Sequence, residues 1–199
     1  MGIFMINNPA IILVDMQNDF FTGPHKAQRI QSVIKPLQRL IAVARKNAVP
    51  VIYCIDAHYP QDVEVTQKWR GHTIKNTKGA EVISEISPDQ KVDYIVEKRA
   101  YSGFYETDLD PLLQNLYDGE GAKSVVIGGV QTNIGIRHTA ADAFFQGYHI
   151  IVAEDGVDAL SDENHQQGLM YLEYVYNAKI MTTNNIIKEI TSKNSYLAS

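Results

Sequence analysis

Short apolar runs alternate with amphipathic segments along the chain. The runs have the length of buried strands, and the segments between them place apolar residues three or four apart, as on a helix face. The expected strands are residues 10–14, 49–55, 93–97, 125–130, 149–153 and 179–182, and the expected helices are residues 33–47, 162–175 and 185–192, with others beginning near 78, 110 and 134. This alternation predicts a three-layer α/β fold: a six-stranded, mainly parallel sheet with helices on both faces, in a single domain over residues 1–199.

The segment from Val125 to Ala143 changes its period halfway. It begins as an apolar run that ends in paired glycines, which is typical of a buried parallel strand. Beyond Thr132 the apolar positions take helical spacing, and they are Ile134, His138, Ala141 and Phe145. A sharp turn from strand to helix lies at the carboxyl edge of the sheet, beside the unpaired N–H groups of the helix start. Gly135, at this turn, therefore marks a predicted site for an electron-rich group or a nucleophile.

Three other strands end on residues that carry chemistry. Asp15 follows the first run, Asp56 and His58 follow the second, and Lys98 follows the third. Parallel strands deliver their carboxyl ends to one edge, so these side chains are expected to meet. Asp15 alone is also typical of a turn or capping carboxylate, and Lys98 alone of a solvated lysine. Together they predict an acid/base pair, in which the ammonium favours the ionised carboxylate while burial opposes it.

Asp56 and His58 predict a metal site, because residues two apart in an extended chain point the same way. His72 lies in the long polar connection over residues 59–91 and could fold back to complete the set. Two imidazoles and a carboxylate suit Zn²⁺, Fe²⁺ or Mn²⁺ and leave open positions for water or substrate. The alternative is that both histidines are surface or hydrogen-bonded loop residues.

Composition narrows the class of protein. With 199 residues, 45% hydrophobic and 21% charged, the chain suits a globular domain with a sizeable core. A net charge of −5 without a Lys/Arg cluster argues against a nucleic-acid surface, and no apolar run approaches membrane-spanning length. The single cysteine, Cys54, excludes an internal disulfide and favours a buried thiol in a reducing compartment. We therefore expect a cytoplasmic protein without nucleic-acid or membrane partners.

Blocks of residues in a fixed order resemble the isochorismatase-like hydrolase superfamily, and within it the nicotinamidase-related amidases. The blocks are VDMQNDF at 14–20, DAH at 56–58, WRGH at 69–72, GAE at 79–81, EKRAYSGF at 97–104, TDLD at 107–110, the stretch 125–143, and ED at 154–155. Each block alone is modestly specific, whereas their shared order is strong and covers nearly the whole chain.

The resemblance implies an α/β fold with a six-stranded parallel sheet, and an active site that joins an aspartate, a lysine and a cysteine. It places the first two at Asp15 and Lys98. The metal ligands of the nicotinamidase branch fall on Asp56, His58 and His72. The family further implies a divalent metal (Zn, Fe or Mn), no organic cofactor, a small-molecule substrate and a homo-oligomer.

The same resemblance implies the rest of the pocket. A fourth metal ligand in some members lies where Glu64 stands, and Phe20, Trp69 and Tyr101 would line a pocket for a flat, small substrate. The family also has a non-proline cis peptide just before the residue that matches Gln131. That bond would direct N–H groups into an oxyanion hole.

Gly135 departs from the amidase pattern, because the cysteine nucleophile of the family aligns with it. In the amidase mechanism the aspartate takes the thiol proton, the thiolate attacks the carbonyl carbon, and the acyl-enzyme is hydrolysed. Loss of the nucleophile costs on the order of 10⁶ in rate in a serine hydrolase, and Cys54 lies before the end of a different strand. True isochorismatases resemble this chain in having glycine here. They hydrolyse a vinyl ether with the aspartate as general acid.

Three hypotheses follow from this combination of amidase-like and isochorismatase-like features. The first is amide (C–N) hydrolysis of nicotinamidase type without the cysteine, by water that a metal ion or Asp15 activates, with Asp15 and Lys98 as the acid/base pair. The second is vinyl ether hydrolysis of isochorismatase type, in which Asp15 is the acid and Gly135 makes room for the substrate. The third is a pseudoenzyme that binds a small ligand or partner without turnover.

Overall fold

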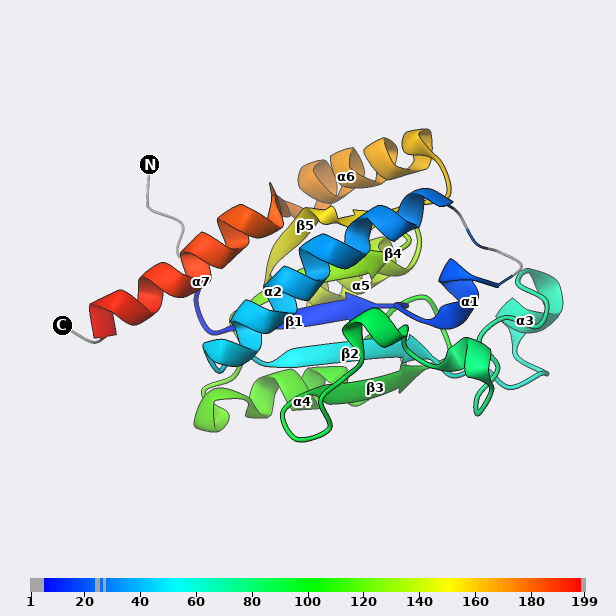
Figure 1. Ribbon diagram of the computed structural model, residues 1–199, viewed down its shortest axis with the longest axis horizontal. Coiled ribbons are helices and arrows are strands. Elements are labelled where there is room, and N and C mark those ends of the chain that lie inside the picture. The colour runs from blue at the N-terminus through cyan, green and yellow to red at the C-terminus, as the bar shows by residue number, and fades with distance from the viewer. Residues whose placement is uncertain (1–5, 24–25, 27, 198–199) are drawn as a thin grey trace.

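A parallel sheet of six strands forms the centre of the molecule (Figure 1). The computed structural model describes residues 6–23, 26 and 28–197. The strands are β1 (Pro9–Val14), β2 (Val51–Asp56), β3 (Tyr94–Lys98), β4 (Ser124–Val130), β5 (His149–Asp158) and β6 (Lys179–Met181). They lie in the order β3-β2-β1-β4-β5-β6, with all neighbours parallel. The predicted fold class is confirmed.

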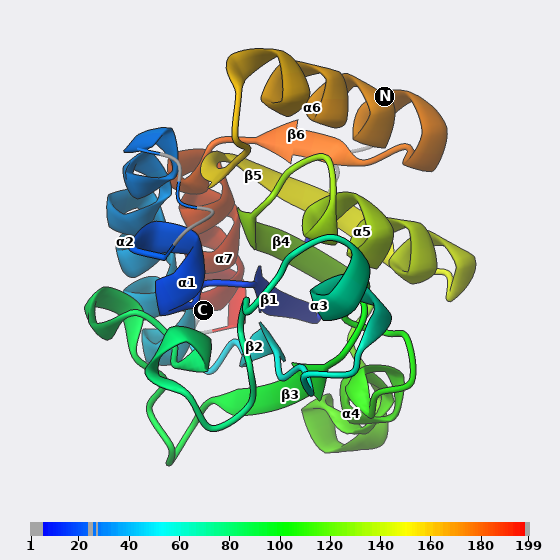
Figure 2. The ribbon, with the colours of Figure 1, turned by 90° about the vertical axis from the view of Figure 1, so that its right-hand side faces the viewer.

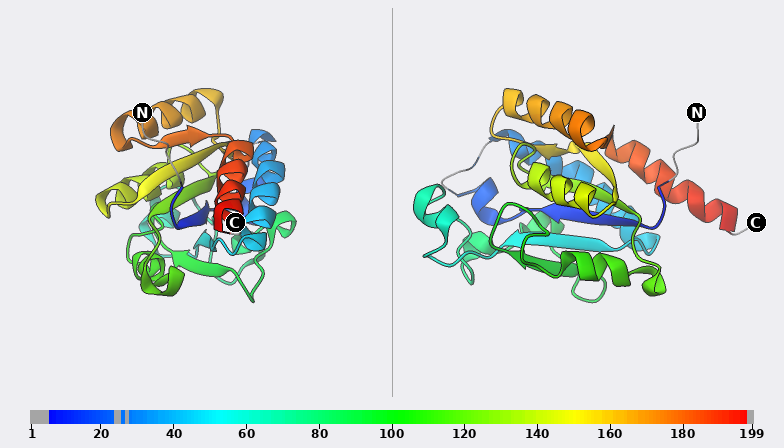
Figure 3. Two further views of the ribbon diagram at one scale, coloured as in Figure 1. Left: turned by 90° about the vertical axis from the view of Figure 1, so that its left-hand side faces the viewer. Right: turned by 180° about the vertical axis from the view of Figure 1, so that it is seen from behind.

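Helices cover both faces of the sheet. On one face α2 (Ile34–Lys46) and α7 (Thr183–Leu197) lie side by side, as Figure 3 shows. The other face carries α4 (Leu109–Asn115), α5 (Gly135–Phe145) and α6 (Asp162–Tyr176). Along β1, Ile11 and Leu13 join the apolar core on the α2 side, while Ile12 and Val14 join the core on the α5 side. Burial on both faces explains why the strands appear in the sequence as continuous apolar runs.

The connections contain several short helical turns. They are α1 (Asn18–Phe21), α3 (Val63–Gln67) and the 3₁₀ turns Gln28–Val33, Lys78–Ala80, Ser84–Ile86 and Tyr117–Gly119. The turn expected after Lys78 is therefore present, and α1 and α3 were not expected. Among the described residues, no helix combines the length and apolar character needed to cross a membrane.

Two sequence expectations about elements were wrong. The strand expected at 149–153 continues to Asp158, so Glu154 and Asp155 lie inside β5 rather than in a loop. The register between β4 and β5 shifts near Gly128, and the chain then pairs again beside Gly129 and Val130. A bulge of this kind adds residues that break the apolar run without ending the strand.

The apolar face expected for α5 was also wrong. His138 and Phe145 are exposed, and the buried face is formed by Ile136, Thr139, Ala140 and Ala143. Small residues let the helix backbone approach the sheet closely, which a count of large apolar residues does not detect.

Candidate active site

Three neighbouring strands end at one place on the carboxyl edge of the sheet, which faces the viewer in Figure 2. Asp56 and Lys98 are the last residues of β2 and β3, and they are direct partners in the strand register. Asp15 follows β1, and its N–H donates to the carbonyl of Cys54 on β2 (3.0 Å). Strand pairing therefore brings these three side chains together.

Lys98 joins the two carboxyl groups. Its Nζ lies 2.9 Å from Oδ1 of Asp15 and 2.5 Å from Oδ1 of Asp56. It also donates to the carbonyl of Ala100 (3.1 Å). All three charged residues are buried, with exposed fractions of 5% or less. The acid/base pair expected from the sequence is thus an ion-pair cluster that includes Asp56.

The charges in this cluster are distributed unequally. Burial raises the pKa of Asp15 well above 3.8, the negative charge of Asp56 adds to that rise, and Lys98 only partly opposes it. Burial also disfavours the charged form of Asp56, but Lys98 and His58 outweigh it and hold its pKa at about 2. Lys98 stays protonated, since both carboxyl groups raise its pKa against the effect of burial. Of the three groups, Asp15 is therefore the one whose neutral, protonated form the surroundings favour.

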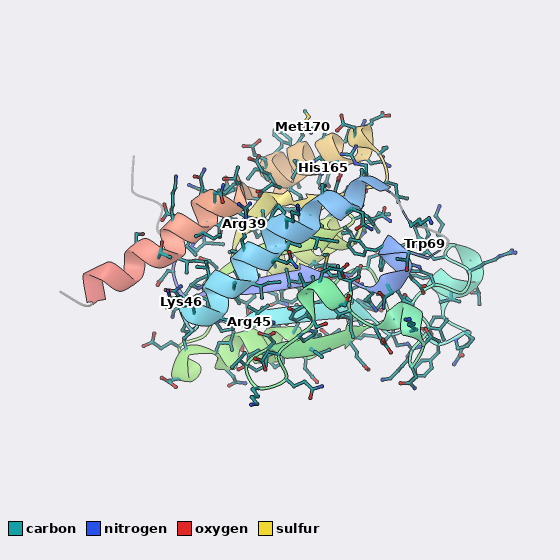
Figure 4. All side chains as sticks on the ribbon, in the orientation of Figure 1. Arg39, Arg45, Lys46, Trp69, His165 and Met170 are labelled. Atoms are coloured by element: carbon teal, nitrogen blue, oxygen red, sulfur yellow. The ribbon has the colours of Figure 1, made fainter. Side chains whose placement is uncertain are left out.

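A cavity opens onto the cluster. Trp69 and Tyr101 form part of its wall, and Trp69 Nε1 donates to the Tyr101 hydroxyl (3.1 Å). Trp69 lies at the end of the molecule where β1 to β3 end (Figure 4). The lining residues are Asp15, Phe20, Asp56, Glu64, Trp69, His72, Tyr101, Gln131, Ile134 and Gly135. This lining carries three carboxyl groups and no lysine or arginine.

The turn between β4 and α5 forms the opposite wall. The peptide bond between Val130 and Gln131 is cis, as the resemblance implied. The Gln131 carbonyl accepts the N–H groups of Ile134 (3.0 Å) and Ile136 (3.2 Å), which closes the turn. Gly135, the first residue of α5, lines the cavity.

The space at Gly135 is filled by the charged cluster. A Cβ atom added there would lie 2.8 Å from Oδ2 of Asp15 and 3.0 Å from Cγ1 of Val14. The Asp15 carboxyl therefore packs directly against the glycine, where the resemblance places a nucleophile. A thiol at this position would require Asp15 to move.

Gln17 supports Asp56 and was missed in the sequence. Its buried amide donates to the carbonyls of Asp56 (2.7 Å) and Ala80 (2.8 Å) and accepts the Asp56 N–H (2.8 Å). The signal available was a polar residue between Asp15 and Phe20, two residues already expected at the site.

The expected metal ligands lie beside the cavity. His58 Nε2 is 3.6 Å from Oδ2 of Asp56 and 3.9 Å from Oε2 of Glu64, and His72 packs edge-on against Phe20 (ring centroids 4.3 Å apart). Burial and the charge of Asp56 raise the pKa of Glu64 to about 7. Over the described part of the chain, no three His, Cys, Asp or Glu side chains are arranged to hold a metal ion. The donor types nevertheless suit a divalent ion. Imidazole and carboxylate groups are common ligands of such ions, and a cation would offset the negative charge of the carboxyl groups collected there.

The structure brings together nearly all the residues expected from the sequence. Asp15, Asp56, His72 and the predicted pocket residues share one cavity, Lys98 lies directly behind it, and His58 contacts Asp56 from outside the lining. Ile134 joins the lining, although the sequence pointed only to its helical spacing. The chemical roles of these residues stay predictions.

Comparison with known proteins identifies the family and the fold. Residues 9–185 match the family model described as "Isochorismatase domain". A solved N-carbamoylsarcosine amidase from Thermoplasma acidophilum is 40% identical, with a TM-score of 0.79 over 88% of this chain and 96% of that chain.

Two further relatives bear on activity and metal binding. A protein of Arabidopsis thaliana named "Probable inactive nicotinamidase At3g16190" is 30% identical over 84% of this chain and 89% of its own length. The pyrazinamidase of Pyrococcus horikoshii, solved in complex with zinc, is 28% identical, with a TM-score of 0.76 over 88% of this chain and 99% of that chain. The match to the family model over most of the chain, the shared fold and the buried Asp15–Lys98 pair lead to one conclusion: the chain belongs to the isochorismatase family of hydrolases.

Proposed function

We propose that this hydrolase cleaves the C–N bond of a small, flat amide by direct attack of water, without a covalent enzyme intermediate. The observation that carries the proposal is the packing of the Asp15 carboxyl against Gly135, beside Lys98 and on the cavity wall. A proton carrier faces the substrate space, and Gly135 has no side chain that could form a bond to the substrate.

Asp15 is assigned both proton transfers. As its carboxylate, it takes a proton from water while the water oxygen bonds to the carbonyl carbon, and it then gives that proton to the leaving nitrogen. A raised pKa suits this double role, because a general acid/base is most effective when its pKa lies near the working pH. Lys98 remains charged and holds the carboxyl in place. The positive end of the α5 dipole lies at Gly135 and favours the developing oxyanion.

Asp56, His58 and His72, with Glu64 beside them, are the residues proposed to hold a divalent metal. Such an ion would supply a Lewis acid next to the substrate carbonyl. The zinc complex of the related pyrazinamidase and the donor types beside the cavity support this proposal. Metal analysis of the purified protein, and a melting temperature that falls on chelation and recovers with Zn²⁺, would test it.

The cavity walls favour an uncharged substrate. Asp15, Asp56 and Glu64 line the cavity with no lysine or arginine among the lining residues. Isochorismate carries two carboxylates, and no lysine or arginine of the lining would pair with them. One observation still favours vinyl ether hydrolysis as the second candidate: a protonated Asp15 could deliver its proton to carbon.

The test compares nicotinamide, N-carbamoylsarcosine and isochorismate as substrates. We expect turnover of the uncharged amide, and no hydroxamate when hydroxylamine is added, because no acyl-enzyme forms. Turnover of isochorismate alone would replace the first proposal by the second. Saturable quenching of the single tryptophan, Trp69, without turnover of any compound would indicate a binding protein. The single-domain organisation, the cytoplasmic location and the homo-oligomer stay predictions.

A further inference from the structure

A second group of buried polar residues lies behind the β4–α5 turn and outside the cavity lining. Thr132, next to Gln131, is completely buried. Its N–H donates to the Asp158 carbonyl (3.0 Å), and its Oγ1 lies 3.0 Å from Nδ1 of His165. His165 projects from α6, a separate helix (Figure 4).

Asp158 is itself held firmly. It is the last residue of β5 and the register partner of Val130 on β4. Its carboxylate accepts hydrogen bonds from Arg29 Nε (2.7 Å) and from the Ala159 N–H (2.8 Å), and it faces His165 Nδ1 at 3.7 Å. The main-chain carbonyl of Asp158 therefore binds Thr132 directly, and its carboxylate faces His165, the side-chain partner of Thr132.

Packing of α6 holds Thr132 from the apolar side as well. Gly168 lies three residues after His165, so both face the turn from one side of α6. A Cβ at Gly168 would lie 2.9 Å from Cγ2 of Thr132. The side chain of Thr132 is thus held by one polar and one apolar contact from the same helix.

We infer that Thr132, His165 and Asp158 are positioning residues that fix the Gln131–Gly135 turn against the cavity. Thr132 does not line the cavity, whereas Gln131, Ile134 and Gly135 on either side of it do. Anchoring Thr132 therefore sets where those residues lie. The effect on turnover rests on the proposed function, while the effect on the turn itself does not.

Thr132→Val tests the inference, because it removes the hydroxyl and keeps the shape of the side chain. We expect kcat for nicotinamide to fall about 10- to 100-fold, as when a reacting group is misplaced by a fraction of an ångström to an ångström, with KM within about twofold because the aromatic walls are unchanged. Thr183→Val is the matched control. Thr183 is equally buried, and its hydroxyl donates to Asp155 Oδ2 (2.9 Å) at the start of α7.

His165 provides a rescue experiment. In His165→Asn the amide can restore the hydrogen bond to Thr132, whereas in His165→Leu nothing can. We expect the asparagine variant to recover most of the kcat that the leucine variant loses. Equal loss in both would show that His165 only fills space.

The amide ¹H–¹⁵N signal of Gly135 gives a readout without substrate. It is expected to shift in Thr132→Val and to stay in place in Thr183→Val. If the wild-type protein hydrolyses nothing, the proposed function fails and this signal alone decides the inference. An unmoved Gly135 signal, or the same kcat in Thr132→Val and the control, overturns it.

Discussion

The two walls of the cavity are built in opposite ways. On one wall the ends of β1, β2 and β3 bury Asp15, Asp56 and Lys98 in a single ion-pair cluster. The other wall is formed by the β4–α5 turn, where Gly135 presents main-chain atoms and no side chain. The charged wall can hold and move a proton, whereas Gly135 has no side chain that could bond to the substrate. The groups that can exchange a proton therefore lie at the strand ends, and the turn shapes the space beside them.

Asp15→Asn breaks the charged wall with the largest expected effect. The substitution keeps the shape of the side chain and removes its proton transfer, so kcat for the amide substrate is expected to fall by about 10²- to 10⁴-fold. Steady-state kinetics with the wild-type protein as reference measure the loss. Activity that survives in this variant would contradict both enzymatic hypotheses.

The same variant isolates the contribution of Asp15 to stability. Burial raises its folded pKa above the unfolded value of 3.8, so the stability it contributes is fully present below pH 3.8 and is lost as the pH rises through the folded pKa. Asp15→Asn lacks this loss. Urea unfolding of both proteins from pH 4 to pH 8 should show the wild type losing stability relative to the variant as the pH rises. Parallel curves would show that Asp15 has an ordinary pKa.

Lys98→Met tests whether the buried ion pairs of the charged wall stabilise the fold. The substitution leaves two carboxyl groups buried without their cation, and the free energy of unfolding is expected to fall by about 3–5 kcal/mol. The control is Lys75→Met, since Lys75 pairs with the exposed Glu97 and should give no measurable change in urea unfolding. Equal losses in the two variants would contradict a special role for the buried cluster.

The sequence predicts the charged wall better than the turn wall. Asp15 and Lys98 end apolar runs, and parallel strands bring their carboxyl ends to one edge, so their meeting follows from periodicity and topology. The strand limits were predicted where the apolar run is continuous. They failed in β5, where a bulge carries the chain past Glu154 and Asp155 before pairing resumes.

Other features depended on contacts between distant segments. Gln17 reaches Asp56 and Ala80, and His165 reaches Thr132, but neither pairing leaves a periodic mark in the chain. Asp62, Glu64 and Trp69, which contact His58 or His72, lie in the irregular connection over residues 59–91, so no periodic pattern in the sequence predicts these contacts. The buried face of α5 was mistaken because only one large residue, Ile136, contacts the core there, and the rest of that face is formed by small residues such as Ala140 and Ala143.

Gly135→Ala sharpens the contrast between the walls. The new Cβ would lie 2.8 Å from Asp15 Oδ2 and 3.0 Å from Val14 Cγ1, so overpacking should lower the free energy of unfolding by about 1–3 kcal/mol. The cost should be smaller in an Asp15→Ala background, because the nearest atom is then absent. Urea unfolding of the wild type, both single variants and the double variant measures this coupling. Additive effects would show that Asp15 does not occupy the space at Gly135.

Cys54 gives the smallest expected effect, and it bears directly on the proposal that no covalent nucleophile takes part. It is the single cysteine of the chain and is fully buried in β2, where burial raises its pKa to about 12. At pH 8 only about one part in 10⁴ of such a thiol is ionised, and the thiolate is the reactive form. Iodoacetamide should therefore leave the folded protein unlabelled and fully active, while one equivalent reacts in concentrated urea. If the folded protein were instead alkylated and inactivated together, Cys54 would be accessible and reactive, which would contradict its burial and remove this support for hydrolysis by water alone.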